Sequence, residues 1–306
     1  MRRPLSPTLA KVAEQELNET PDRIQQDIII LRVWIRQQPH LRARTEDEFL
    51  IAFLRRCRYS LEETKRRIDR YFTYYNLFPE VMSNRSITQR LLDINRLGVC
   101  LFPDLPKCDN RTALFVARFG QFDPNQYSLR EVYHFVSMAV EIVALENDYA
   151  SVAGICEIID LEGVSSDKMR RFDKVFFRKW WNWLHDCSPL RVKEVYVINM
   201  PKDIQSTILF LYNILSAQVN YPIHVLKTPA ELFEHIGKEC LPEEYGGTNG
   251  HMLESIADME DLLNSYRSYF EQDHKYGTIE ELRPGEIITY EAEFGVNGSF
   301  RKLNWD

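Results

Sequence analysis

Two short apolar runs with a long helical segment between them decide the fold class of this 306-residue chain. Residues 153–159 read AGICEII, residues 195–199 read VYVIN, and the segment between them, DKMRRFDKVFFRKWWNWLH at residues 167–185, has its apolar side chains at helical spacing. Strands that alternate with long helices are typical of an α/β domain with a mostly parallel sheet. We therefore expect such a sheet at the centre of the molecule.

The same alternation extends outward from this pair of strands. Further β-rich runs lie at residues 99–102, 113–119 and 223–226. Further helical segments lie at residues 128–146, 202–218, 229–238 and 253–270. Ser128 and Thr228 are each followed three residues later by a glutamate, which is the spacing of a capping box at the start of a helix.

The residues before Arg96 are predicted to form a series of helices. Ser6-Pro7 and Thr20-Pro21 each place a capping side chain before a proline at the first helical position. Residues 45–48 and 60–63 have the spacing of capping boxes. We expect an N-terminal helical domain over residues 1–95, an α/β domain over 96–250, and a C-terminal helix and tail over 251–306.

Composition argues against several classes of protein. The formal net charge is −7, and a protein that grips nucleic acid needs clustered positive charge to neutralise phosphates. No stretch approaches the roughly 18 to 20 apolar residues that cross a bilayer, and Met1 leads into a polar run at residues 14–16 instead of an apolar signal core. We expect a cytoplasmic protein with no membrane anchor and no nucleic-acid partner.

The motifs of the common enzyme classes are missing. The chain has no glycine-rich phosphate loop, no G-x-S-x-G turn and no H-E-x-x-H pair. His185-Asp186-Cys187 suggests a thiol phosphatase, but the loop that follows lacks glycine and has Lys193 where a bidentate arginine is needed. The histidines and cysteines show no metal-ligand spacing. We expect no catalytic residues, no metal and no cofactor.

Three helical segments have more apolar surface than a one-sided surface helix needs. Ordinary core packing and the lining of a cavity are both compatible with such faces, because hydrophobicity alone does not separate a filled interior from an empty one. The faces include Tyr133, Val136 and Val140 in the first segment, Trp180, Trp183 and Leu184 in the second, and Ile204, Ile208, Leu211 and Leu215 in the third.

Basic residues crowd one part of the N-terminal helices. Seven arginines and lysines lie between Arg55 and Arg70, with only Glu62, Glu63 and Asp69 as acidic neighbours. Two interpretations stay open. The cluster is either a solvated helix face or a patch that meets an anionic membrane, where each basic group contributes on the order of 1 kcal/mol.

Three motifs, in this order, resemble those of the CRAL-TRIO family of lipid-binding proteins. EFLIAFLRR at residues 48–56 is similar to the FLRA helix of the family's N-terminal module, and IIDLEG at 158–163 to its DLEG signature. The third motif is a series of three short patterns, P-x-R, I-N-x-P and LP-x-EYGG. It is matched by PLRV at 189–192, YVINMP at 196–201 and LPEEYGG at 241–247. The resemblance spans about residues 45 to 250 and is greatest to insect tocopherol-transfer-like and retinaldehyde-binding members.

The resemblance implies a helical N-terminal module followed by an α/β domain whose mostly parallel sheet floors a lipid pocket. A mobile gate helix over residues 201–218 would close that pocket. The implied function is a soluble, monomeric carrier that binds one small hydrophobic lipid, such as a retinoid or tocopherol, and transfers it between membranes. The alternative is a lipid-presenting adaptor that holds a phospholipid or phosphoinositide for a partner enzyme or membrane.

The resemblance also assigns candidate residues. The pocket positions fall on Tyr133, Val136, Val140, Ile155, Trp180, Trp183, Leu184, Leu190 and Val195, and the gate adds Ile204, Ile208, Leu211 and Leu215. Val136 and Val140 replace hydroxyl side chains of the tocopherol carrier, so a polar ligand head needs other partners here. Contact with phosphoinositide or a membrane falls on Arg56, Arg58, Arg191 and Lys193. Gln218 and Pro222 replace two basic residues on the gate side.

Overall fold

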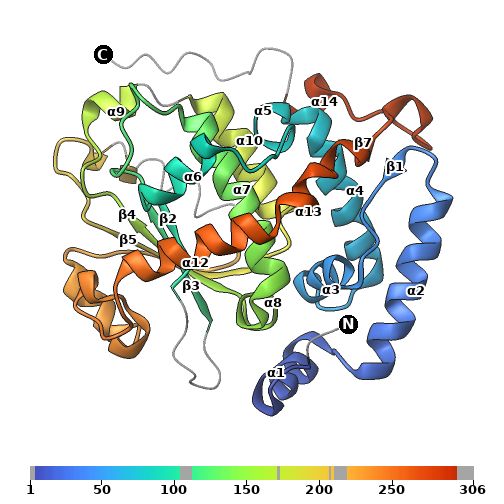
Figure 1. Ribbon diagram of the computed structural model, residues 1–306, viewed down its shortest axis with the longest axis horizontal. Coiled ribbons are helices and arrows are strands. Elements are labelled where there is room, and N and C mark those ends of the chain that lie inside the picture. Colours follow the sequence, from blue (N-terminus) through green and yellow to red (C-terminus); the bar gives the residue numbers. More distant parts are fainter. Residues whose placement is uncertain (1–3, 104–111, 171–172, 207, 210–218, 295–306) are drawn as a thin grey trace.

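The computed structural model describes residues 4–103, 112–170, 173–206, 208–209 and 219–294 (Figure 1). A five-stranded sheet in the order β2-β3-β4-β5-β6 lies in the half of the molecule away from the first four helices of the chain. Its strands are β2 (Cys100–Leu101), β3 (Ala113–Arg118), β4 (Ile155–Asp160), β5 (Val192–Ile198) and β6 (Ile223–Val225). Only β2 runs antiparallel to its neighbour, so the predicted mostly parallel α/β sheet is confirmed.

Helices cover both faces of this sheet. The connections between the parallel strands contain α7 (Leu129–Glu146), α8 (Asp148–Ala153), α9 (Ser166–Arg170) and α10 (Lys174–Asp186). After β6 come the 3-10 turns η1 (Pro229–Glu234), η2 (Lys238–Cys240) and η3 (Glu243–Tyr245), and then α12 (Met252–Ser265), which crosses in front of the sheet in Figure 1. Side chains of one sheet face, among them Ile158 and Tyr196, pack against Leu232, Leu241 and Met252 of this later segment.

The N-terminal region is helical, as predicted. It consists of α1 (Pro7–Leu17), α2 (Pro21–Gln37), α3 (Asp47–Arg56), α4 (Leu61–Leu77), α5 (Pro79–Met82) and α6 (Gln89–Arg96). The first two helices begin as their sequences indicate: Leu9 N donates to Ser6 Oγ at 3.3 Å, and Arg23 N donates to Thr20 Oγ1 at 3.3 Å. Buried side chains of these helices share one hydrophobic core with α7 and α10.

Several local predictions are wrong, and each has a physical reason. The helix expected over residues 167–185 is divided into α9 and α10, and Asp173 caps the second of these by accepting from Val175 N and Phe176 N. The predicted capping boxes at residues 45–48 and 60–63 do not form. In the second, Glu63 instead accepts hydrogen bonds from Arg66 and Arg67. The segment expected over residues 229–238 forms 3-10 turns, although Glu231 does accept a hydrogen bond from Thr228 N.

The described part of the C-terminal segment, up to residue 294, returns to the N-terminal helices. After α13 (Arg267–Glu271) and η4 (Asp273–Lys275), strand β7 (Gly277–Thr278) pairs antiparallel with β1 (Leu41–Arg42). The turn η5 (Glu280–Leu282) and the helix α14 (Tyr290–Phe294) follow. Figure 1 shows this red segment beside the blue and cyan N-terminal helices. The two ends of the described chain therefore form one structural unit.

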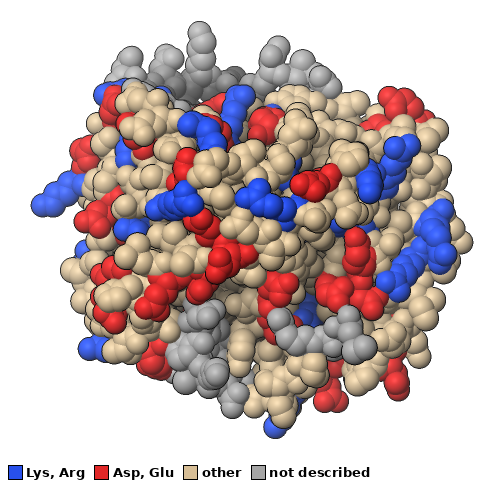
Figure 2. All heavy atoms as spheres, in the orientation of Figure 1, with Lys and Arg blue, Asp and Glu red and all other residues tan. Residues whose placement is uncertain are grey.

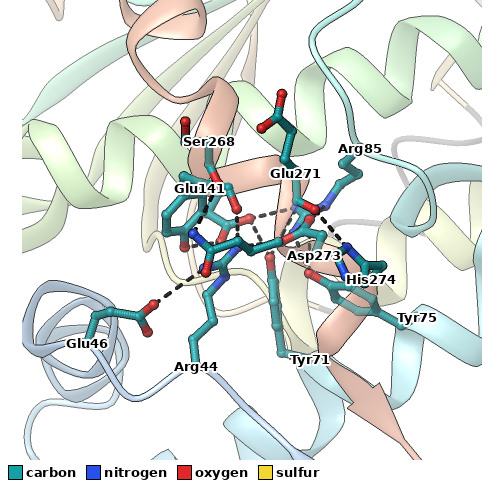
Figure 3. Close-up of polar contacts among 12 residues, drawn as sticks. Arg44, Glu46, Tyr71, Tyr75, Arg85, Glu141, Ser268, Glu271, Asp273 and His274 are labelled. Carbon is teal, nitrogen blue, oxygen red and sulfur yellow. Dashed lines mark hydrogen bonds and ion pairs between the residues drawn. The ribbon is translucent and has the colours of Figure 1, made fainter.

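A buried ionic network ties this unit together (Figure 3). Arg44 Nη2 donates to Asp273 Oδ1 at 2.5 Å, and Arg85 Nε donates to Asp273 Oδ2 at 2.7 Å. Arg85 also donates to Glu141 Oε2 of α7 at 2.6 Å, and Tyr71 OH donates to the same oxygen at 2.7 Å. Burial alone raises the pKa of Glu141, but Arg85 and Arg44 outweigh burial and lower it. Two cations therefore balance two carboxylates inside the protein.

Candidate functional site

A cavity of about 210 Å³ lies between the sheet and helices α7, α9 and α10. Its wall is mostly apolar. It is lined by Phe119, Phe122, Leu129, Tyr133, Glu157, Ile159, Leu161, Val164, Lys168, Met169, Phe177, Trp180, Trp181, Leu184, Val195, Val197, Ile208, Tyr221 and Ile223. A smaller cavity of about 30 Å³ adjoins it toward α7 and β3, and the two share Phe119, Tyr133, Glu157, Trp180 and Leu184.

The alternation of side chains along the strands creates the floor of these cavities. Successive residues of a strand point to opposite faces of a sheet. On β4, Ile155, Glu157 and Ile159 line the cavities, whereas Cys156 and Ile158 belong to the core cluster on the other face. β5 repeats the pattern, because Val195 and Val197 line the large cavity and Tyr196 does not. The sheet thus separates a filled core from an open interior.

Aromatic rings form the wall opposite the sheet. The ring centroids of Tyr133 and Trp180 lie 4.4 Å apart, and both residues border both cavities. Trp181 packs against His185 at 4.1 Å, and Tyr221 OH lies 3.2 Å from His185 Nε2. These ring contacts join neighbouring residues of the wall to one another.

The predicted ligand-contact residues fall into three groups. Lining one or both cavities are Tyr133, Val136, Val140, Ile155, Trp180, Leu184, Leu190, Val195 and Ile208. Trp183 is fully buried behind Trp180, with ring centroids 4.8 Å apart, and Ile204 is buried beside Val195 and Val197; neither lines a cavity. Leu211, Leu215 and Gln218, with most of the expected gate, lie outside the described residues.

Glu157 is a polar lining residue that was not predicted. It stands in the middle of β4 with 9% of its surface exposed, and burial raises the pKa of its carboxyl group to about 7. Burial, and secondarily the charge of Glu157, also raise the pKa of the Tyr133 and Tyr221 phenols. The sequence held one signal for this residue, namely a lone acid inside an apolar strand.

Lys168 is the second ionisable group of the wall and lies on α9. It is half-buried, and its Nζ donates to Gly120 O at 2.7 Å. Burial lowers the pKa of Lys168, and Asp123 opposes that change. The cavity thus has a carboxyl group on its floor and an ammonium group on a helix at its side.

Four arginines form a cluster at the carboxyl end of α10. Arg56 Nη2 and Arg67 Nη1 donate to His185 O at 3.2 and 2.7 Å, and Arg191 donates to Val152 O. Burial lowers the pKa of Arg56 to about 10, with the charges of Arg67 and Arg191 adding to the effect. Burial likewise lowers the pKa of Arg191 to about 10, with the charge of Arg58 adding to it.

This arginine cluster (Arg56, Arg58, Arg67 and Arg191) is short of acceptors. The Nε atoms of Arg56, Arg67 and Arg191 and the Nη1 atom of Arg191 are buried without a hydrogen-bond partner among the described residues. Three of the four predicted phosphoinositide or membrane residues therefore come together here. The fourth, Lys193, forms an ion pair with Glu16, with 3.0 Å between Nζ and Oε2.

The remaining basic residues between Arg55 and Arg70 do not form a common patch. This corrects the interpretation of the whole cluster as a surface that meets an anionic membrane. Arg55 is buried and paired with Glu19 at 2.8 Å and Asp148 at 3.1 Å. Lys65 and Arg66 bond Glu62 and Glu63 on their own helix, and Arg70 pairs with Glu293 of α14. Acidic and basic side chains are interspersed across the face drawn in Figure 2.

Within the described ranges, no helix is long and apolar enough to cross a membrane. The same part of the chain contains no group of three or more His, Cys, Asp and Glu side chains placed to hold a metal ion.

Comparison with known proteins gives matches over most of the chain. The family model described as the CRAL/TRIO domain matches residues 106–247, and the model described as a Pinta-like UBA domain matches residues 20–92. The human alpha-tocopherol transfer protein-like protein is 27% identical over 252 residues, covering 81% of this chain and 72% of its own length. Clavesin-1 of Xenopus laevis is 27% identical over 257 residues, covering 80% and 74%.

Among solved structures, that of Sfh5 aligns with a TM-score of 0.48 and 13% sequence identity, covering 83% of this chain and 92% of the other. The assignment rests on the sequence matches. Residues 106–247, which include most of the cavity wall, match the CRAL/TRIO domain model, and about four fifths of the chain is similar to the tocopherol transfer-like proteins and the clavesins.

Proposed function

We propose that this protein is a carrier that holds one hydrophobic lipid in the cavity between the sheet and helices α7, α9 and α10. The observation that carries the proposal is the mostly apolar wall of that cavity, with aromatic rings facing aliphatic strand residues such as Val195 and Val197. A ligand that exchanges water for this wall gains roughly 25 cal/mol for each Å² of apolar surface buried. Proteins of the CRAL/TRIO family bind lipophilic ligands and transfer them.

Two features favour a carrier over an enzyme. The Cys187 thiol is fully buried and burial raises its pKa, whereas a nucleophilic cysteine needs a lowered pKa and access to substrate. The ionisable groups of the cavity wall, Glu157 and Lys168, are not hydrogen-bonded to each other or to a nucleophile among the described residues. We infer a cytoplasmic, monomeric protein whose ligand is the lipid itself, with no further cofactor.

The arginine cluster favours contact between the carrier and a membrane. Its buried N–H groups, which have no acceptor within the described ranges, suit the several oxygens of a phosphate group, since charge-assisted hydrogen bonds are the strongest that arginine makes. We propose that the cluster contacts anionic lipid headgroups when the carrier meets a membrane. His185 links the cluster to the cavity, because its carbonyl accepts from Arg56 and Arg67 and its ring touches Trp181 and Tyr221.

Native mass spectrometry after incubation with retinol, α-tocopherol and mixed phospholipids tests the carrier. We expect one bound lipid per chain and its movement between donor and acceptor vesicles. A bound lipid that never moves between vesicles would favour the lipid-presenting adaptor. A protein that stays lipid-free after each incubation would rule out both.

A matched pair of variants on β6 locates the ligand. Ile223→Trp fills the cavity from an edge strand, so we expect at least a tenfold loss of lipid binding. His224→Trp changes the next residue, which stacks on Tyr196 on the opposite face of the sheet, and should leave binding within twofold. Equal losses in both variants would place the ligand elsewhere.

A further inference from the structure

The carboxyl group of Glu157 differs from those of two other buried acids, Glu141 and Asp160, in its hydrogen bonds. Glu141 accepts hydrogen bonds from Arg85, Tyr71 and Tyr269. Asp160, three residues along the same strand, accepts from Asn199 Nδ2 at 2.8 Å and Tyr245 OH at 2.7 Å. No described residue donates a hydrogen bond to Glu157.

Glu157 faces the two cavities, where a bound ligand could reach its carboxyl group. It lies between Ile155 and Ile159 on the central strand of the sheet, and it lines both the large and the small cavity. Burying a carboxyl group without a hydrogen-bond partner costs free energy that a glutamine in a network or a plain aliphatic residue would avoid. An acid in this place is therefore explained if the missing partner belongs to a molecule that enters the cavity.

We propose that Glu157 binds the hydroxyl group of an alcohol-type lipid and thereby selects hydroxylated lipids over hydrocarbons and fatty acids. This inference rests on the proposed carrier function and names the chemical class of its ligand. The hydroxyl group would lie on the sheet floor near Tyr133 and Tyr221, the two phenols within the field of Glu157. The apolar part of the ligand would extend along the aromatic wall.

The choice of an alcohol follows from hydrogen-bond chemistry. A hydroxyl group both donates and accepts, so it satisfies the carboxyl group whether that group is ionised or protonated. A hydrocarbon leaves Glu157 without a partner, and a fatty-acid carboxylate is repelled by the ionised form. A carboxylate ligand would instead favour Lys168 on α9, whose Nζ already donates to Gly120 O. A neutral hydroxyl head group should therefore bind at Glu157, whereas a negatively charged head group should bind at Lys168.

The test uses three probes with the same 16-carbon chain: 1-hexadecanol, hexadecanoate and hexadecane. Their affinities for the full chain are measured by quenching of tryptophan fluorescence, since Trp180 and Trp181 line the cavity, and by native mass spectrometry. We expect the alcohol to bind at least tenfold more tightly than either other probe. Glu157→Leu should remove this preference, whereas Glu157→Gln, which keeps a donor and an acceptor, should retain it within threefold.

Glu194→Leu is the matched control. Glu194 lies on the neighbouring strand β5, on the sheet face away from the cavity, where Tyr196 OH donates to it. This variant should keep the preference for the alcohol. If Glu157→Leu still prefers the alcohol, or if hexadecanoate binds best to the unmodified protein, the assignment of Glu157 is overturned while the carrier function stands. If the protein binds no probe and no lipid from a mixture, the carrier function itself fails and the inference with it.

Discussion

Buried charge is handled differently in two regions of this protein. Between the N-terminal helices and the C-terminal segment, Arg44, Arg85, Glu141 and Asp273 satisfy one another. In the cavity wall and at the end of α10, Glu157 and three arginines of the cluster (Arg56, Arg67 and Arg191) have polar atoms without a hydrogen-bond partner among the described residues. Under the functions proposed above, the first region serves stability, whereas the second leaves polar groups free for a ligand at a cost in stability.

The largest effect is expected from breaking the paired region. Arg85→Met removes the cation shared by Glu141 and Asp273 and leaves two buried carboxylates with incomplete partners, so we expect a loss of about 3–5 kcal/mol in the free energy of unfolding. Urea denaturation measures it. Arg90→Met is the control, because Arg90 pairs with Glu131 at the solvent-exposed surface and its loss should leave the urea midpoint nearly unchanged. Equal effects would contradict the comparison.

Replacing Glu157 should have the opposite effect, because it is expected to increase the free energy of unfolding of the lipid-free protein at neutral and higher pH. Burial raises the pKa of Glu157 to about 7 in the folded state, so the folded protein binds this proton more tightly than the unfolded chain. The stability of the wild type should therefore fall as pH rises from about 4.5 to 7, by up to on the order of 3 kcal/mol. Glu157→Gln should equal the wild type near pH 4 and exceed it at pH 8. A pH-independent difference between the two would refute this account.

A smaller effect is expected at the arginine cluster. Arg191 has two buried donors without acceptors in the described part of the chain, so Arg191→Gln should weaken binding to vesicles that contain a phosphoinositide by roughly fivefold, which corresponds to about 1 kcal/mol. Lys193→Gln is the partnered counterpart, because Lys193 is paired with Glu16. It should change vesicle binding by less than twofold. A greater loss from Lys193→Gln would reverse the assignment of the two residues.

The smallest effect is expected at the first residues of two helices. One helix has a capping side chain that makes a hydrogen bond, and the other has one that does not. Ser128 accepts from Glu131 N and completes a capping box, so Ser128→Ala should cost about 1 kcal/mol of stability. Ser60 makes no side-chain cap hydrogen bond, and Ser60→Ala should cost a few tenths at most. Thermal denaturation of both variants checks the pair. Equal losses would mean that Ser60 caps α4 in solution.

The order of elements was predictable from sequence because it rests on local patterns. Alternating strands and helices, the N-terminal caps at Ser6 and Thr20 and the capping box at Ser128 all depend on residues a few positions apart. The pairing of Arg85 with Asp273 joins residues 188 positions apart, and no periodic pattern in the sequence predicts it. The capping boxes expected at residues 45–48 and 60–63 failed because nearby side chains took the groups that the boxes needed.

The candidate site was only partly predictable for a related reason. Apolar lining residues such as Tyr133 and Trp180 were assigned through the family resemblance, since their spacing alone also suits an ordinary core. Trp183 shares their helical face but is covered by Trp180, which only packing reveals. Glu157 was missed because the meaning of a single acid depends on what faces it across the sheet and helices. Its lack of a hydrogen-bond donor among the described residues is a property of the folded molecule.

The bond between Arg44 and Asp273 has a consequence for biosynthesis. Arg44 leaves the ribosome 229 residues before Asp273, which at about 5–20 residues per second is roughly 10 to 45 s. During that interval the guanidinium group lacks the carboxylate that balances it in the finished protein. The N-terminal helices, although made first, would complete their packing among the last parts of the molecule, and a nascent chain stalled before residue 273 would expose them to chaperones and proteases.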